Sequence, residues 1–555
     1  MNKKVLISIA TGIMVIGVIL FFLLRRSDLR SELQQSLNEQ GNAVINQSQF
    51  LDEIKSFYAD RDYLEVWFFN GSLSKAGDEL IDKINEVKYD GLIPADYHLK
   101  QLTSYASKKD SDKVEFKSLS TEEKVNVELL LTDAFFQLAS DLDKGKIDPV
   151  QLDSSWKFER PESVLNYTEL LNAIASGSAV ENEIEKIFPN SALYIKGRKA
   201  IKKLYEIKAK DTLTWELEEV SEAIEVGDKH PAIPSLRQRL IFWEFLSPYD
   251  GGDELLFDST MWEGLKQYQE ANGMKPDGVI GSLAAESLNH SPAQLIEVAA
   301  VNMERLRWLP EIDWQKEMIL VNVANYQLDY LTNMDTTFSA KVIVGKEYNE
   351  SPTFSAPMSY IVFSPYWNIP PSITKEEIIP AVQNNKNYLE EKNMEVVTAS
   401  GDPVKASQVD WTLKDDEEFP FRVRQKPGGD NSLGRVKFMF PNKYNIYIHD
   451  TPARSLFQKE TRALSHGCIR IENPDQFAKI LLKDKSWTDD KIQGAMNQEV
   501  EEIVELDRRI PVVILYLTFW AEDDGRAHFR PDVYNRDKAL LKALKQPRKS
   551  TVQET

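Results

Sequence analysis

The stretch Ser465-His466-Gly467-Cys468-Ile469-Arg470 contains the only cysteine among the 555 residues of the chain. A second short stretch upstream, Ile446-Tyr447-Ile448-His449-Asp450-Thr451-Pro452, supplies a histidine, His449. The thiolate is the reactive form of cysteine, and a neighbouring imidazolium lowers the thiol pKa from its free value of about 8.5. We therefore interpret Cys468 as a nucleophile and His449 as its general base.

Both residues stand in local sequences that suit this chemistry. Residues 444–449 alternate aromatic and β-branched side chains as a strand does, so His449 is expected at a strand end, a rigid position for a base. Gly467 has no Cβ, which allows a substrate carbonyl to approach the main chain. The backbone amides of His466, Gly467 and Cys468 are therefore the candidate donors of an oxyanion hole.

Three other uses of these residues must be weighed. A single cysteine is often only a small buried hydrophobe, and a lone histidine only a satisfied polar residue. A structural zinc site needs four ligands, commonly in close pairs, and this chain has one cysteine and six histidines. A papain-like protease would place its cysteine well before its histidine, whereas here His449 precedes Cys468.

The wider sequence favours the nucleophile. Residues 449–457, His-Asp-Thr-Pro-Ala-Arg-Ser-Leu-Phe, and residues 462–470, Arg-Ala-Leu-Ser-His-Gly-Cys-Ile-Arg, closely resemble the active-site signature of the L,D-transpeptidases with a YkuD-type catalytic domain, in particular the large periplasmic YcbB-like branch. That resemblance implies a β-rich catalytic domain with a capping insertion. It also implies peptidoglycan stem peptides and glycan as partners.

The resemblance carries a reaction with it. Cys468 would attack the carbonyl of the third stem residue, usually diaminopimelate, and expel the terminal D-alanine to leave a thioester. An amine of a neighbouring stem would then form a 3-3 cross-link, with no cofactor and no metal. His449 would be held by a main-chain carbonyl near Asp450, and Ser465, His466 and Gly467 would shape the oxyanion region. Carbapenems would be expected to acylate Cys468.

Two other functions stay open at the level of sequence. Water in place of the amine would make the protein an L,D-carboxypeptidase with the same residues. A wall-binding anchor protein, in which catalysis is secondary, is the second alternative. The sequence predicts no oligomeric state.

Charge gives an independent indication of the substrate. The chain has 67 basic and 87 acidic residues, a net charge of −20, which argues against nucleic acid as a partner. Residues 421–470 depart from this average, with ten basic residues against three acidic ones. Arginine suits the free carboxylates of a peptide, so Arg470 is the first candidate for substrate binding. Weaker candidates to line the cleft are Tyr447, Arg454, Trp367 and Asn368.

The N-terminus is uncharged from Val5 to Leu24, between Lys3-Lys4 and Arg25-Arg26. Twenty helical residues span a bilayer core of about 30 Å, so the sequence predicts a transmembrane anchor over residues 1–26. A cleaved signal peptide would have a shorter apolar region and a small-residue cleavage site. The resemblance implies an anchor in the cytoplasmic (inner) membrane, with the catalytic portion in the periplasm.

The predicted fold class is α+β and multidomain: an N-terminal transmembrane helix, a helical scaffold, a small helical peptidoglycan-binding module and the β-rich catalytic domain. Helical periodicity, turn signals and β-branched runs place the boundaries. The predicted segments are a stalk (27–48), the scaffold (49–218), the binding module (219–295), the catalytic domain (296–536) with its capping insertion (372–421), and a basic C-terminal tail (537–555).

Overall fold

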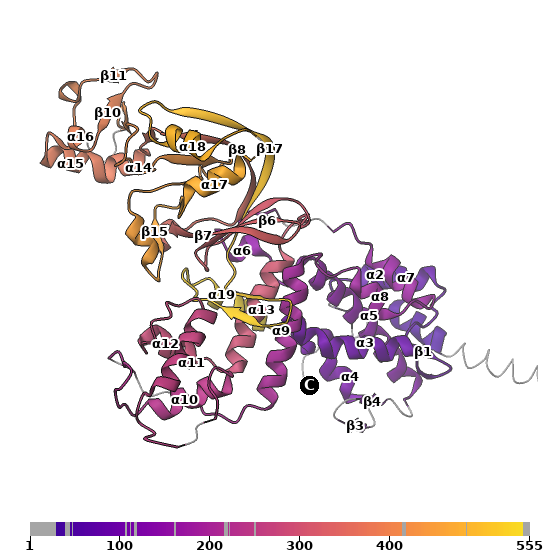
Figure 1. Ribbon diagram of the computed structural model, residues 1–555. Helices are drawn as coiled ribbons and strands as arrows, with labels where there is room; N and C mark the ends of the chain where they lie inside the picture. Colours follow the sequence, from indigo (N-terminus) through magenta and orange to yellow (C-terminus); the bar gives the residue numbers. More distant parts are fainter. Residues whose placement is uncertain are drawn as a thin grey trace, which may run out of the picture.

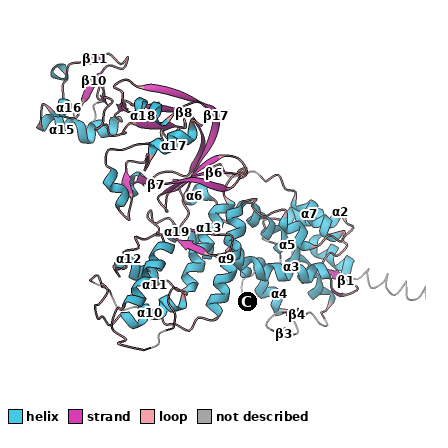
Figure 2. Ribbon diagram, in the orientation of Figure 1, coloured by secondary structure: helices cyan, strands magenta, loops and turns pink. Residues whose placement is uncertain are grey.

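The structure is a computed structural model. It describes residues 29–38, 45–46, 48–105, 108–110, 113–115, 119–159, 163–215, 220, 222–248, 251–412, 418–483 and 485–547. Helices dominate its N-terminal half, and a curved sheet with a small cap dominates its C-terminal half (Figures 1 and 2).

The predicted membrane anchor has to be corrected, both in the fold class and in the localisation. Among the described helices, none combines the length and the apolarity needed to cross a bilayer. The longest, α5 (Thr121–Lys144), begins with Glu122, Glu123 and Lys124 and carries further acidic residues. Residues 5–24, where the anchor was expected, lie outside the described residues. The fold class is therefore a mixed α+β multidomain arrangement with a β-rich catalytic domain.

The scaffold is built around α5. A capping box formed by Ser120 and Glu123 satisfies the first amides of this helix, and its apolar residues are buried on nearly every side. The helices α2 (Leu51–Asp60), α3 (Lys75–Glu86), η2 (Pro94–Tyr97) and α7 (Tyr167–Ala175) pack against it. The other elements of the scaffold are β1 (Phe68–Phe69), β2 (Ser72–Leu73), η1 (Val87–Asp90), α4 (Leu99–Ser104), β3 (Lys108–Asp110), β4 (Lys113–Glu115), α6 (Pro149–Leu152), α8 (Val180–Glu185) and α9 (Ala192–Ala209).

A three-helix unit follows, made of α10 (Ile233–Phe242), α11 (Ser259–Ala271) and α12 (Ser282–Leu288). Its helices enclose a separate small core that includes Leu236, Met261 and Leu288. The turn before α12 needs a glycine, because Gly278 has φ +70° and a Cβ there would lie 2.1 Å from the Trp262 indole nitrogen.

Helix α13 (Pro292–Arg307) joins the halves of the molecule, between α9 and α19 (Asp537–Lys545) (Figure 1). Glu304 and Arg307 of α13 form a fully buried ion pair at 2.5 Å. Arg305 binds Asp537 at 2.6 Å, and Leu540 and Leu544 of α19 are buried. The described part of the C-terminal tail is therefore packed against the body of the protein.

The catalytic half contains a nine-stranded sheet in the order β15-β7-β16-β14-β13-β8-β17-β5-β6, and β6 also pairs with β7. β-Branched and aromatic side chains alternate into one large core beneath α17 (Pro474–Leu481) and α18 (Asp489–Met496). The strands are β5 (Met318–Asn322), β6 (Gln327–Thr332), β7 (Asp335–Gly345), β8 (Phe354–Phe363), β13 (Val436–Met439), β14 (Ile448–His449), β15 (Ala463–Ser465), β16 (Ile469–Ile471) and β17 (Glu502–Leu515). A separate hairpin pairs β18 (Phe519–Ala521) with β19 (Ala527–Phe529).

A small cap stands at the end of this sheet, farthest from the scaffold (Figure 1). It has its own core, which includes Ile378, Val396 and Val423. Its sheet runs from Trp367 to Gln425, slightly beyond the expected insertion on both sides. The cap elements are β9 (Trp367–Asn368), α14 (Pro371–Ile373), η4 (Thr374–Ile378), α15 (Ile379–Asn384), α16 (Tyr388–Glu391), β10 (Met394–Val397), β11 (Pro403–Val404), η5 (Ala406–Gln408) and β12 (Arg422–Gln425).

Candidate functional site

Strand pairing brings the two predicted catalytic residues together. β14 and β16 run parallel, with His449 opposite Arg470 and Ile448 opposite Ile469. Cys468 directly precedes β16, and alternate residues of a strand share a face. Cys468 and Arg470 therefore share one face with His449, while Ile448 and Ile469 point into the core, where both are fully buried.

His449 is held in one tautomer. Its side chain is buried, and Nδ1 lies 2.5 Å from the main-chain carbonyl oxygen of Asp450. A carbonyl oxygen can only accept, so Nδ1 carries the proton and Nε2 is the basic atom. Burial, followed by the positive charge of Arg470, lowers the pKa of His449 from 6.5 to about 3. The imidazole is therefore neutral in the free protein at physiological pH.

Cys468 is protonated in the same state. Burial raises the pKa of the thiol above its ordinary value, although hydrogen bonds from Tyr447 and the charges of Lys437 and Arg470 act in the opposite direction. The resting pair is thus a neutral thiol and a neutral imidazole. This differs from the expectation that an imidazolium already lowers the thiol pKa, because His449 is too deeply buried to hold a charge.

The loop before Cys468 has a fixed shape. Gly467 adopts φ +112°, in the region that favours glycine. The Ser465 hydroxyl accepts the Gly467 N–H at 3.1 Å and donates to the Cys468 carbonyl at 2.6 Å. Of the three amides expected in the oxyanion hole, that of Gly467 is therefore already used inside the loop. The amides of His466 and Cys468 remain as candidates.

A basic, aromatic wall adjoins the thiol. Arg470 has a buried Nε without a hydrogen-bond partner among the described residues. Lys437 of β13 lies opposite His449 in the sheet, and its ammonium nitrogen stands 3.9 Å from the centre of the Tyr447 ring. Sequence reasoning counted Lys437 only as part of a basic stretch. Its alternation between the core residues Val436 and Phe438 was the signal that could have placed it on the site face.

The contacts of the other predicted residues do not involve the thiol. The Asp450 carboxylate accepts the amides of Arg435 at 2.8 Å and Thr451 at 2.6 Å, and pairs with Arg454 at 2.5 Å, so these groups shape the turn after β14. Trp367 and Asn368 belong to the cap sheet, where they pair with β12, and no recorded contact joins them to Cys468.

The cap and the scaffold both reach the nucleophile loop. The exposed His466 lies 3.3 Å from Glu377 of η4 in the cap. On another side, a cavity of about 500 Å³ is bounded by His466 and Gly467, by Tyr348 and Tyr444, and by the scaffold segment 154–157. Within the described part of the chain, no group of three or more His, Cys, Asp or Glu side chains is placed to hold a metal ion.

Comparison with known proteins identifies two domain families in the chain. Residues 316–501 match the family profile of the L,D-transpeptidase catalytic domain, and residues 52–201 match that of a scaffold domain. A Haemophilus influenzae protein named "Putative L,D-transpeptidase" is 34% identical over 248 residues, which are 45% of this chain and 50% of that protein. The match therefore spans half the length of that relative.

Two solved structures were also matched, with low overall agreement. An L,D-transpeptidase from Xylanimonas cellulosilytica shows 10% identity and a TM-score of 0.16, over 54% of this chain and 100% of that one. A fused Zn-dependent amidase, peptidase and peptidoglycan-binding domain-containing protein from Clostridium acetobutylicum shows 9% identity and a TM-score of 0.15, over 53% and 99%. Scores this low carry no argument about fold or function.

Proposed function

We propose that this chain, whose residues 316–501 match the L,D-transpeptidase catalytic domain, forms 3-3 cross-links in peptidoglycan through a thioester on Cys468. The observation that carries the proposal is the placement of Cys468, directly before β16, on the same face as His449 of the neighbouring parallel strand β14, with His449 fixed by the Asp450 carbonyl so that Nε2 is the base.

The first half-reaction makes the acyl-enzyme. Nε2 of His449 takes the proton of the Cys468 thiol while Sγ attacks the carbonyl carbon of the third stem residue. The bond from that carbon to the terminal D-alanine nitrogen then breaks, and the imidazolium returns the proton to the leaving amine. The neutral resting pair suits this sequence, because the charges appear only as the reaction proceeds.

The second half-reaction resolves the thioester. A side-chain amine of a second stem attacks the thioester carbon, His449 accepts the amine proton, and Sγ leaves and is reprotonated. Arg470 and Lys437, beside the thiol, would bind the carboxylates of the donor stem. The α10–α12 unit would hold the enzyme on the glycan.

The test incubates the chain from residue 48 onward with a disaccharide-tetrapeptide and follows the products by mass spectrometry. We expect a dimer with the mass of two substrates minus one alanine, and no dimer with Cys468→Ala. A Cys468-dependent tripeptide without dimer would identify an L,D-carboxypeptidase instead. The absence of any Cys468-dependent product would contradict the proposal and favour the wall-binding alternative.

A further inference from the structure

The geometry points to Ser351 as a positioning residue for the oxyanion hole, an inference that rests on the thioester chemistry proposed above. Ser351 lies in the loop between β7 and β8 and is fully buried. Its hydroxyl oxygen is 2.7 Å from the carbonyl oxygen of Gly467, the residue before the nucleophile. It does not touch the thiol, and no sequence motif identified it.

The direction of this hydrogen bond is fixed by a second contact. The amide N–H of Gly345 donates to the Ser351 hydroxyl oxygen at 3.0 Å. Since the hydroxyl has one proton, that proton points to the other neighbour, the Gly467 carbonyl. Ser351 therefore locks the Gly467 carbonyl toward the β7–β8 loop.

A locked carbonyl also locks the next amide. In a trans peptide, the C=O of Gly467 and the N–H of Cys468 point in opposite directions. The hydrogen bond from Ser351 thus turns the Cys468 N–H away from the β7–β8 loop, and a substrate carbonyl bound by this amide would have to approach from that side. No hydrogen bond from this amide is recorded among the described residues, so it is available to an oxyanion.

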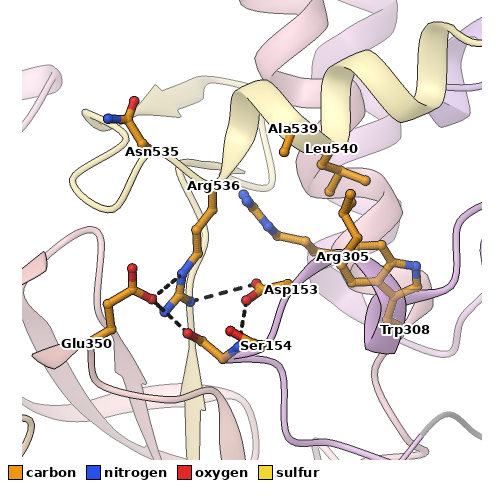
Figure 3. A pocket seen from close by; sticks show the side chains of 11 residues that line it. Asp153, Ser154, Arg305, Trp308, Glu350, Asn535, Arg536, Ala539 and Leu540 are labelled. Carbon is orange, nitrogen blue, oxygen red and sulfur yellow. Dashed lines mark hydrogen bonds and ion pairs between the residues drawn. The ribbon is translucent and has the colours of Figure 1, made fainter. Parts of the chain in front are cut away.

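The scaffold holds Ser351 in place. Thr353 lies two residues after Ser351. Its carbonyl accepts the Lys157 amide at 2.9 Å, and its amide donates to the Ser155 carbonyl at 3.0 Å. The preceding residue, Glu350, accepts the Ser155 hydroxyl at 2.7 Å and pairs with Arg536 near the C-terminus. Figure 3 shows Arg536 pointing toward Glu350 and toward Asp153 of the scaffold.

These contacts join three distant parts of the chain behind one peptide group. The scaffold segment 153–157 contacts Glu350 and Thr353, on either side of Ser351, and Arg536 near the C-terminus binds Glu350. The Tyr534 hydroxyl accepts the Ser351 amide at 3.4 Å and donates to the Gly345 carbonyl at 2.6 Å. The scaffold therefore holds the loop residues that flank Ser351.

The test compares two reactions of the same thiol in Ser351→Ala. Acylation by a carbapenem passes through an oxyanion: Sγ adds to the lactam carbonyl, the ring C–N bond breaks, and the ring nitrogen takes the proton. Alkylation by iodoacetamide displaces iodide and forms no oxyanion. We expect acylation, followed by intact mass, to slow by about 10- to 100-fold, while the alkylation rate and its pH profile stay unchanged.

Ser364→Ala is the matched control. Ser364 is also buried and donates its hydroxyl to a backbone carbonyl, that of Ala495 at 3.1 Å, without touching the nucleophile loop. Both of its rates should equal those of the unchanged protein. Tyr534→Phe, which loosens the same loop without removing Ser351, should show a smaller loss confined to acylation. If Ser351→Ala does not fold, the acylation rate of Tyr534→Phe tests the inference in its place.

The outcomes separate this inference from the proposed function. Acylation of Ser351→Ala within twofold of the unchanged protein would overturn the role of Ser351, and so would an equal loss in acylation and alkylation. If the unchanged protein is alkylated but never acylated by either the carbapenem or the tetrapeptide, the proposed function itself fails.

Discussion

At Cys468, burial and nearby charges oppose each other, and burial has the larger effect on the thiol pKa. The thiol therefore titrates above its ordinary range, and the rate of its alkylation by iodoacetamide should keep rising well into the alkaline range instead of reaching a plateau near neutrality. The measurement is the alkylation rate from pH 6 to 10.5, with Cys468→Ala as the blank. A plateau below pH 7 would indicate a preformed thiolate–imidazolium pair and would contradict the neutral resting state.

Lys437 is the residue whose charge can be tested most cleanly. It lies over the Tyr447 ring, and its positive charge lowers the thiol pKa. Lys437→Met should move the alkylation profile to higher pH and slow acylation at neutral pH. Lys443→Met is the control, since Lys443 is exposed and stands over Tyr444 instead, 5.4 Å from that ring. Identical profiles for the two variants would show that Lys437 does not act on the thiol.

Among single residues, the sequence predicted best the roles of those that lie within a short local motif. The strings around His449 and Cys468 could be assigned because each lies within one strand or one loop. Lys437 and Ser351 could not be assigned in this way. The role of Lys437 arises from sheet pairing, and Ser351 lies in a loop more than a hundred positions away from Gly467 in the chain. Trp367 and Asn368, the weaker candidates to line the cleft, pair with β12 in the cap sheet, and their role in the cleft stays a prediction.

At the scale of elements, an ion-pair cluster ties β5, β17 and the end of α17 together. Glu317 binds Arg508 at 2.6 Å and Lys483 at 2.8 Å, and accepts a hydrogen bond from Tyr330. Despite some desolvation, these partners lower the pKa of Glu317 from 4.5 to about 2. The ionised carboxylate thus stabilises the fold above pH 4.5, and this stabilisation is lost as the pH falls through 2.

Glu317→Gln should lower the free energy of unfolding by about 1 kcal/mol at pH 7, a modest value because the side chain is partly in water. The difference from the unchanged protein should shrink between pH 4.5 and pH 2, as urea unfolding at several pH values can measure. Glu505→Gln, at an exposed position of β17, is the control and should change little at any pH. A pH-independent loss for Glu317→Gln would contradict the ionic explanation.

Strand periodicity predicted the β-rich half and helical periodicity the scaffold, because each pattern is local. The order of the nine strands could not be predicted, since β7 pairs with β16 and β15 across more than a hundred residues. The cap was expected as an insertion, but its sheet also uses strands just outside the expected bounds. The apolar run at residues 5–24 predicted a membrane helix that the described structure does not contain.

For the whole molecule, α13 is the shared support of the scaffold and the catalytic half. Glu304 compensates the buried charge of Arg307 and accepts the Ile147 amide at 2.7 Å, while Arg307 reaches the Asp90 carbonyl at 2.7 Å. Glu304→Gln would remove the carboxylate paired directly with Arg307, leaving the electrostatic interaction with Asp90, and should cost about 3–5 kcal/mol. Glu297 lies on the same helix as Glu304 and forms an exposed pair with Lys545 of α19. Glu297→Gln, which breaks this pair, should cost less than about 1 kcal/mol.

Denaturant unfolding followed by tryptophan fluorescence measures both variants. Equal stabilities for Glu304→Gln and Glu297→Gln would show that the buried pair does not support the junction. The sequence could not predict that the charged residues of α13 are buried, because their partners come from distant segments of the chain.

The most direct test of a thioester at Cys468 is the mass of the intact protein during turnover of a disaccharide-tetrapeptide. We expect a transient increase equal to the mass of the donor minus that of its terminal alanine, located on the peptide that contains Cys468 and lost on addition of an amine acceptor. An increase that persists in Cys468→Ala, or turnover without any protein-bound acyl group, would contradict a thioester at Cys468.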